Sequence, residues 1–396
     1  MNDVYLISAR RTPIGKAGGI LKDVEPEKLA AAVFQEVLKE TGLRPEQVEQ
    51  VVLGNVVGPG GNLARLSALE AGLPFEVPGL TVDMQCGSGL EAIRVAACMI
   101  QAGAADIVIA GGVESCSLAP WKMEKPRNMY GMETPRVFAR ARFAPDTIGD
   151  PDMGIAAENV AARFGVSRED QDTFALRSHQ KAVTAMEGSR FADEMVPIPT
   201  PSRKEPERVA VKDEGPRPDT SLAKLQALKP VFLPNGTVTA GNACGINDGA
   251  AAVLLVSGKK ARELGLTPAL EYIDAAAAGV DPNILGIGPV PAVRKLLGKH
   301  GLTVDQLDRV EFNEAFASQV LASIRELGID EACLNKDGGA LALGHPYGAS
   351  GAILVTRLLH GMKAEIDSKW GLATMGIGGG LGIAALFKKW EGWHHA

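Results

Sequence analysis

A cysteine followed by two glycines lies where a strand is expected to end and a helix to begin, at residues 83–90 (DMQCGSGL). The positive end of a helix dipole lowers the pKa of a thiol and favours the nucleophilic thiolate. The glycines also let a substrate approach the backbone closely. We therefore predict that Cys86 is a nucleophile. The alternative is a buried structural cysteine, the common state of a free thiol.

A histidine lies in a second glycine-rich turn, at residues 338–351 (GGALALGHPYGASG). Of the six histidines, only His345 has this setting. An imidazole at such a turn can meet a thiol and serve as its base or as an oxyanion donor. Most lone histidines have no such role, but the turn repeats that of Cys86, so we predict that His345 acts with Cys86.

A third segment, residues 311–317 (EFNEAFA), follows an expected strand and opens a helix. Asn313 can be a simple N-cap, or it can hold a water or substrate oxygen beside Cys86 and His345. Glu314 has the reach of an acid/base, although glutamates at a helix start usually interact with the dipole. The residues alone leave these alternatives open.

The cysteine pattern predicts thiols in a reducing compartment. The five cysteines form no C-x-x-C pair, their number is odd, and no leader segment precedes Val4, so we expect a cytoplasmic protein. Cys98, Cys116 and Cys333 are expected to be structural.

Other motifs are excluded. The sequence holds no phosphate loop and no spaced Cys/His metal cluster. Residues 380–385 fit G-x-G-x-x-A, but too little chain follows for a dinucleotide-binding unit, so we expect no such site.

Composition and charge limit the partners. The 396 residues are 46% hydrophobic and 22% charged, as in globular proteins, and the net charge of -6 does not favour nucleic acid. Two uncharged stretches, 338–356 and 370–387, are interrupted by glycine, so we expect no membrane span.

Alternating β-type and Ala-rich runs predict a parallel or mixed sheet with crossover helices. Before Gly112 we expect strands at 4–7, 48–57, 80–85 and 106–110, and helices at 27–41 and from Leu90. The pattern then changes, which predicts an insertion with helices near 156–164 and 168–186. Alternation returns at 237–257 and restarts after 268.

The restart resembles the first half of the chain. Residues 47–51 (QVEQV) have a counterpart at 306–310 (QLDRV), the Cys86 turn has one around His345, and residues 105–112 have one at 372–379. An internal duplication explains these matches. Two such halves would direct the C-terminal ends of their strands toward a common crevice, where open α/β sheets place their sites.

With these motifs assembled, the chain resembles the thiolase family, the acyl-CoA C-acyltransferases, over essentially its whole length. The matching runs are RTPIGK at 11–16, CGSG at 86–89, TAGNACGINDGA at 239–250, NEAF at 313–316, GHP at 344–346 and GIGGG at 376–380.

The resemblance implies an α/β thiolase fold, with two duplicated βαβαβαββ half-domains in layered arrangement and an inserted loop domain. The expected boundaries are 1–117 plus 237–265, then 118–236, then 266–396. It also implies a homodimer or homotetramer.

The resemblance also implies site roles. Cys86 would take an acyl group from CoA, His345 would activate it and contribute to an oxyanion hole, and Asn313 would position a water for a second oxyanion. The expected neighbours of CoA are Met153, Arg217, Lys224 and Cys244. Substrates would be coenzyme A thioesters, with no permanently bound cofactor. Cys244 replaces the family's usual serine, and Asp152 stands where biosynthetic members tend to have histidine.

The largest departure from the family is Gly376. It stands where the family has a cysteine that removes and returns the α-proton, and glycine cannot transfer a proton. General acid/base catalysis is typically worth about 10² to 10⁴-fold, so ordinary Claisen chemistry should be impaired.

Three interpretations follow from the sequence. The first is a thiolase-type acyltransferase working through acyl-Cys86. The second is decarboxylative condensation or transfer to an acceptor other than CoA, since related decarboxylating synthases use a cysteine, histidine and asparagine. The third is a catalytically weak acyl-CoA-binding or scaffolding subunit.

Overall fold

The computed structural model describes residues 2–126, 128, 130, 134–138 and 140–393. Its main sheet is built from β1 (Val4–Arg11), β2 (Gly15–Lys16), β3 (Gln50–Gly54), β4 (Gly79–Val82), β5 (Ile107–Ser115), β10 (Asn247–Ser257), β11 (Leu270–Gly279), β12 (Arg309–Phe312), β13 (Trp370–Ile377) and β14 (Leu381–Lys389). The strand order is β12-β13-β14-β11-β1-β10-β5-β3-β4, and β2 pairs with β10.

The sheet consists of two halves with the same strand pattern. The N-terminal half is β1-β10-β5-β3-β4 and the C-terminal half is β11-β14-β13-β12, joined where β1 pairs antiparallel with β11. Next to β12, the counterpart of β4 is reduced to one parallel bridge between Val310 and Leu334. This arrangement confirms the predicted duplicated α/β fold.

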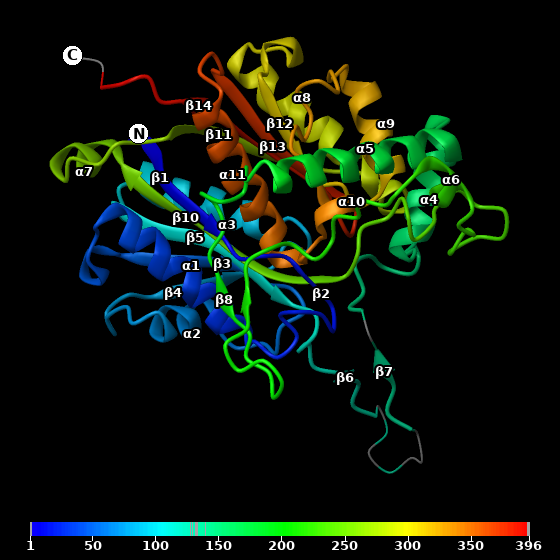
Figure 1. Cartoon of the computed structure of the whole chain (residues 1–396), viewed down its shortest axis with the longest axis horizontal. Helices are drawn as coiled ribbons and strands as arrows, with labels where there is room; N and C mark the ends of the chain where they lie inside the picture. The colour runs from blue at the N-terminus through cyan, green and yellow to red at the C-terminus, as the bar shows by residue number, and fades with distance from the viewer. Residues whose placement is uncertain (1, 127, 129, 131–133, 139, 394–396) are drawn as a thin grey trace.

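Helices cover the sheet in layers (Figure 1). They are α1 (Pro26–Thr41), α2 (Leu63–Glu70), α3 (Ser88–Gln101), α4 (Met153–Phe164), α5 (Arg168–Glu187), α6 (Leu222–Gln226), α7 (Gly258–Glu263), α8 (Pro289–His300), α9 (Ala317–Leu327), α10 (Ala340–Leu343) and α11 (Tyr347–Ala364). Short 3-10 turns occupy Pro45–Gln47, Pro282–Ile287 and Val304–Gln306.

Three apolar clusters define these layers. The central cluster holds α3 and α11 between residues of both sheet halves, including Val253 and Met375. A second packs α1 and α2 on the outer face of the N-terminal half. The third packs α8 and α9 on the outer face of the C-terminal half. Both central helices start at the turns that carry Cys86 and His345, so this layering places the two turns side by side.

Strand β10 shows why a central strand needs an unbroken apolar run. All of its residues are buried, and it lies between β1 and β5. A strand covered on both faces reads as continuously hydrophobic. The alternation expected over 237–257 corresponds to β10 only from Asn247, because Asn242 closes a turn by accepting a hydrogen bond from the Thr239 N–H at 2.8 Å.

The segment 118–236 contains α4, α5 and α6, and two small hairpins. The hairpins are β6 (Lys122–Met123) with β7 (Val137–Phe138), which projects from the body, and β8 (Ile198–Pro199) with β9 (Val209–Ala210). Arg11 of β1 is fully buried and ion-paired with Glu194 and Asp213 at 2.7 and 2.8 Å, which ties the segment to the sheet. The three domain boundaries stay a prediction.

In the part of the chain that the structure describes, the helices are too short or too polar to cross a bilayer.

Candidate active site

Cys86 lies in the turn between β4 and α3. The turn is tight: Gln85 has a positive φ of 44°, and a Cβ on Gly87 would lie 2.4 Å from the Ile377 Cδ1. Burial raises the pKa of the Cys86 thiol to about 11, although the N–H groups of Gly378 and of Cys86 itself act to lower it. The prediction of a lowered pKa is therefore wrong in direction, because desolvation outweighs the local donors.

His345 is buried, and both its backbone and its ring form hydrogen bonds. Its N–H donates to Asn247 Oδ1 at 3.0 Å, and its Nδ1 lies 2.6 Å from Ser350 Oγ. The Ser350 hydroxyl donates to the Pro346 carbonyl at 3.0 Å, so its oxygen accepts the hydrogen bond from the histidine ring. We therefore assign the proton of the neutral imidazole to Nδ1. Burial lowers the pKa of His345 to about 4. The imidazole is thus neutral at pH 7, with Nε2 left to accept a proton.

Asn313 contacts His345 rather than capping a helix. Its Nδ2 lies 3.4 Å from His345 Nε2, and its backbone N–H donates to the Thr374 carbonyl at 3.1 Å. The N-cap of α9 is Phe316. Of the two alternatives for Asn313, the structure excludes the cap.

Glu314 is a buried structural group. Its carboxylate accepts hydrogen bonds from Ser178 Oγ at 2.6 Å, Asn335 Nδ2 at 2.8 Å and the Leu341 N–H at 3.2 Å. Burial raises its pKa. These contacts join α5 and α10 to the end of β12, and they account for the whole carboxylate without an acid/base role.

Cys244 and Tyr347 belong to the same cluster. The Cys244 N–H donates to the Ala315 carbonyl at 3.0 Å, and burial followed by the nearby Cys86 raises the Cys244 pKa to about 12. The Tyr347 ring stands edge-on to the His345 ring at 5.1 Å. Burial and the thiols of Cys116, Cys244 and Cys86 raise the pKa of Tyr347. Sequence reasoning missed Tyr347, although its place two residues after His345 was a usable signal.

Gly376 lies in β13, between a residue that contacts Asn313 and a residue that contacts Cys86. It comes two residues after Thr374, which binds Asn313, and two before Gly378, which faces Cys86. A Cβ on Gly376 would lie 2.5 Å from Gln319 Nε2 and 3.3 Å from the Gly286 carbonyl oxygen. The groups nearest to this position are therefore an amide and a carbonyl, and neither can remove a proton from carbon at neutral pH.

Three of the expected CoA neighbours lie in the segment 118–236, and the fourth, Cys244, lies after it near Cys86. Met153 begins α4, while Arg217 and Lys224 are exposed near α6, where Lys224 pairs with Asp219 at 2.7 Å. Among the described residues, Arg217 and Lys224 form no hydrogen bond or ion pair with Cys86, His345 or Asn313. Phe232, which sequence reasoning missed, lies between the start of α4 and the start of α9: a Cβ on Gly154 would lie 2.2 Å from the Phe232 ring, which stands 6.5 Å from the Phe316 ring.

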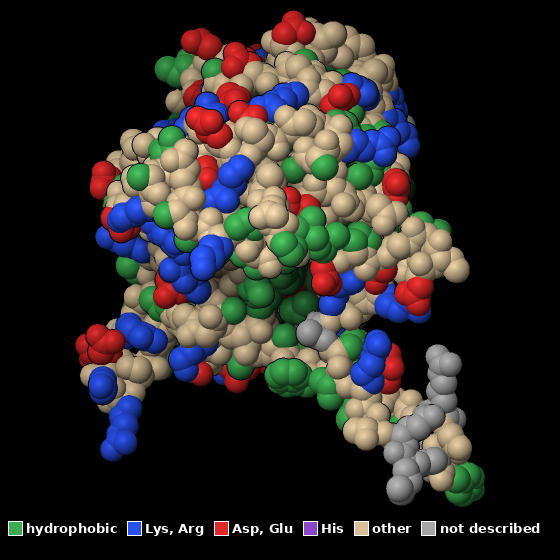
Figure 2. Space-filling view, turned by 90° about the vertical axis from the view of Figure 1, so that its right-hand side faces the viewer, with side chains coloured by type: hydrophobic (Ala, Val, Ile, Leu, Met, Phe, Trp, Pro, Cys, Tyr) green, Lys and Arg blue, Asp and Glu red, His purple; other side chains and the backbone are tan. Residues whose placement is uncertain are grey.

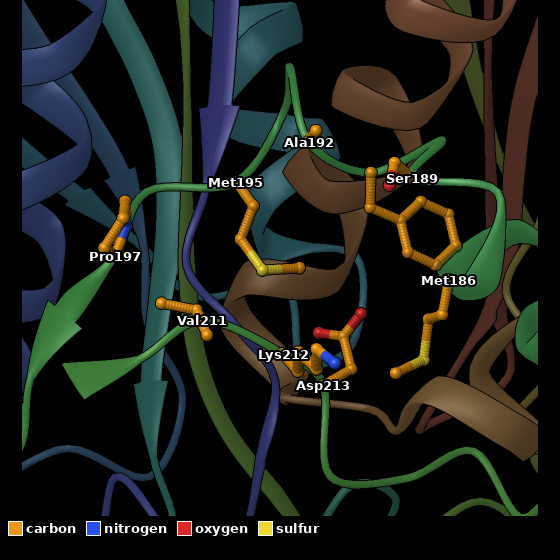
Figure 3. A pocket seen from close by; sticks show the side chains of 9 residues that line it. Met186, Ser189, Ala192, Met195, Pro197, Val211, Lys212 and Asp213 are labelled. Atoms are coloured by element: carbon orange, nitrogen blue, oxygen red, sulfur yellow. The ribbon is translucent and has the colours of Figure 1, made fainter. Parts of the chain in front are cut away.

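The structure has two hollows that could admit a ligand. The face that carries the β6–β7 hairpin has a hollow lined by hydrophobic side chains (Figure 2). A separate cavity of about 280 Å³ lies elsewhere, where Met195 and Asp213 face one another (Figure 3). Asp213 is already paired with Arg11, and none of the Cys86 cluster lines this cavity.

Metal chemistry has no cluster of ligands in the described ranges. No three His, Cys, Asp or Glu side chains lie together there in a way that could hold an ion. The site is built instead from a thiol, an imidazole, an amide and backbone N–H groups.

Comparisons with known proteins agree with this geometry. Residues 4–259 match the model of the thiolase N-terminal domain, and residues 266–389 match that of the thiolase C-terminal domain. The acetyl-CoA acetyltransferase of Pseudomonas aeruginosa is 48% identical, over 97% of this chain and 98% of that protein.

Solved structures give the same result. The acetyl-CoA acetyltransferase of Bacillus anthracis superposes with a TM-score of 0.93 at 41% identity, covering 98% of this chain and 99% of the other. Human mitochondrial 3-ketoacyl-CoA thiolase in complex with CoA superposes with a TM-score of 0.91 at 37% identity, covering 98% of both chains. The chain therefore belongs to the thiolase family and is an acyltransferase of that type.

Proposed function

We propose that this protein is an acyl-CoA C-acyltransferase, similar to acetyl-CoA acetyltransferases, that carries the acyl group on Cys86. The observation that carries the proposal is the environment of the thiol. The N–H groups of Cys86 and Gly378 favour negative charge at this sulfur, and a neutral imidazole whose Nε2 carries no proton lies in the same cluster.

In the first half-reaction, Nε2 of His345 accepts the Cys86 proton as the sulfur attacks the thioester carbonyl. The bond from the carbonyl carbon to the CoA sulfur then breaks, and His345 returns the proton to that sulfur. Free CoA and acyl-Cys86 result. A neutral thiol and a neutral base suit this route, because the charges develop only during the attack.

The second half-reaction needs a carbanion at the α-carbon of a second thioester. We propose that this step is slow here, since Gly376 has no side chain and its nearest neighbours are the Gln319 amide and the Gly286 carbonyl. Asn313, held beside His345, would position a water that stabilises the developing oxyanion.

The same observation favours a second candidate, decarboxylative condensation. Loss of CO₂ from a malonyl-type thioester leaves its electron pair on the α-carbon, so no base is needed. A requirement for malonyl-CoA in product formation would identify this reaction, and equal activity with acetyl-CoA alone would exclude it.

Coenzyme A would contact Met153, Arg217, Lys224 and Cys244. The exposed cations Arg217 and Lys224 suit its phosphates, and Cys244 lies beside the reacting thiol. The substrate is a diffusible thioester, so we propose no permanently bound cofactor. Unpaired thiols support a cytoplasmic location.

We also propose a homodimer or homotetramer. Strand β4 is the outer strand of the N-terminal half, and its Leu80 is exposed. Exposed apolar side chains also lie on the preceding α2 and on the loop that follows it, at Leu66, Leu69 and Phe75. An unpaired strand edge of this kind invites pairing with a second chain.

Intact-protein mass spectrometry after mixing with a panel of acyl-CoAs tests the acyl-enzyme. We expect a mass increase of one acyl group and release of CoA, both lost in Cys86→Ala. Cys244→Ala, which removes the neighbouring thiol, is the matched control and should keep the mass increase. An increase that persists in Cys86→Ala contradicts the proposal.

A further inference from the structure

Gln319 occupies the space over Gly376. It lies in the first turn of α9 and is 2% exposed. Its Nε2 would be 2.5 Å from a Cβ on Gly376, so the amide fills the place where a side chain would begin.

The Gln319 amide has an unused donor. Within the described residues, Nε2 has no hydrogen-bond partner, and the atom is buried. Buried donors in native proteins nearly always have a partner, and an unpaired one is destabilising. Such a group in a binding site gains from any ligand that brings an acceptor oxygen to it.

The position of Gly376 says which ligand atom can do so. The strand around Gly376 reaches Asn313 through Thr374 and Cys86 through Gly378. On the proposed function, on which this inference rests, the reacting acyl carbons lie between those contacts. The α-carbon of the substrate then lies near Gly376. The β-carbon is bonded to it, so an oxygen on the β-carbon lies near the same position.

We propose that Gln319 is a substrate-binding residue that selects coenzyme A thioesters with an oxygen on the β-carbon. Its Nε2–H donates a hydrogen bond to that oxygen, in the place where other family members have a proton-transferring thiol. The shared chemistry is a β-oxygen acceptor, which a 3-oxoacyl or a malonyl-type group supplies. An unsubstituted acyl group leaves the amide unpaired.

Calorimetric titration of Cys86→Ala tests this without chemistry. Acetoacetyl-CoA and butyryl-CoA have the same chain length and differ in the β-oxygen. Malonyl-CoA and propionyl-CoA form a second pair, which separates a carboxylate from a ketone. We expect the oxygenated member of at least one pair to bind about tenfold more tightly, the ratio that one net hydrogen bond supplies.

Adding Gln319→Met to this background removes the N–H and keeps the length of the side chain. We expect the preference to vanish through weaker binding of the oxygenated thioester, with the binding of butyryl-CoA and propionyl-CoA unchanged within about twofold. Unchanged binding of these two shows that the variant site is folded.

No preference in either pair for Cys86→Ala overturns the proposal, and so does a preference that survives Gln319→Met. Equal loss for all four thioesters assigns Gln319 a structural role and also overturns it. Failure of the proposed function is seen separately, as absence of acyl transfer to the wild-type protein in mass spectrometry.

Discussion

The outer edges of the two sheet halves are finished differently. In the N-terminal half, β4 is a complete strand whose outer edge pairs with no further strand among the described residues, although Asn62 Nδ2 donates to its Gly79 carbonyl at 2.7 Å. In the C-terminal half its counterpart is the single Val310–Leu334 bridge, and the inserted helix α5 covers it: Lys181 donates to the Leu334 carbonyl at 2.9 Å and Ser178 accepts from the Gly339 N–H at 3.1 Å. A helix of the same chain therefore covers the outer edge of the C-terminal half, whereas no further strand in the described part of the chain pairs with β4.

The central turns of the halves differ as well. The N-terminal turn presents a thiol, and the C-terminal half supplies His345, Asn313 and the Gly376 strand. Duplicated geometry thus places a thiol on one side and an imidazole and an amide on the other, which the proposed function uses as nucleophile, proton acceptor and oxyanion donor. The predictions below test this division.

The largest effect is expected at His345. His345→Ala should slow acylation of Cys86 about 10² to 10⁴-fold, because the neutral thiol loses its proton acceptor. Asn313→Ala should acylate at a rate close to wild type and lose mainly the later carbon-carbon step. Rapid-quench mass spectrometry measures the first step and product formation the second. Equal loss of acylation in both variants breaks the division.

Gly376→Cys should restore proton transfer on carbon, provided that Gln319 makes room. The added Cβ meets Nε2 at 2.5 Å, so we expect the double variant with Gln319→Ala to exceed Gly376→Cys alone. Thiolysis of acetoacetyl-CoA should rise toward the roughly 10² to 10⁴-fold of a positioned acid/base. Gln319→Ala alone is the control. Robust wild-type thiolysis, unaffected by either variant, would show that Gly376 does not limit the reaction.

The pKa of Cys86 sets the pH dependence of its alkylation. Because that pKa is raised to about 11, the thiolate fraction grows with pH throughout the neutral range. Iodoacetamide should label Cys86 roughly ten times faster for each pH unit from 7 to 10. Peptide mass spectrometry separates Cys86 from the exposed Cys98, which serves as internal reference. A rate that levels off below pH 8 contradicts the raised pKa.

The smallest effect on the reaction is expected at the outer edge of β4. Leu80→Lys adds a charge to β4 and should shift the assembly toward smaller species without abolishing the folded state. Ile366→Lys, at an exposed position away from β4, is the matched control. Light scattering during size-exclusion chromatography measures both. An unchanged mass for Leu80→Lys would place the interface elsewhere.

The sequence predicted the fold class and the family because those depend on local patterns. Alternating strands and helices, and long motifs around Cys86, Asn313 and His345, lie along the chain in order. The internal repeats predicted two halves, and the resemblance to the family added their βαβαβαββ order; the strand order of the structure agrees with this fold.

The pKa of Cys86 and the proximity of Gln319 to Gly376 could not be predicted from the sequence, because both depend on elements far apart along the chain. The helix-dipole argument treated Cys86 through its own turn, whereas its pKa depends on packing by both halves. The amide of Gln319 meets Gly376 from another element, 57 positions earlier, and no local pattern marks the pair. Roles of Cys86, His345 and Asn313 stay predictions until the experiments above are done.

The place of β10 in the sheet has a consequence for synthesis of the chain. This strand fills the gap between β1 and β5, yet it is separated from β5 by the whole inserted segment. A ribosome adding about 5 to 20 residues per second needs roughly 6 to 24 s to make that segment. During this interval the nascent N-terminal half lacks its central strand and exposes the apolar edges of β1 and β5. The insertion therefore sets a waiting time before the first half-domain can close, and holding factors such as chaperones have their opportunity within it.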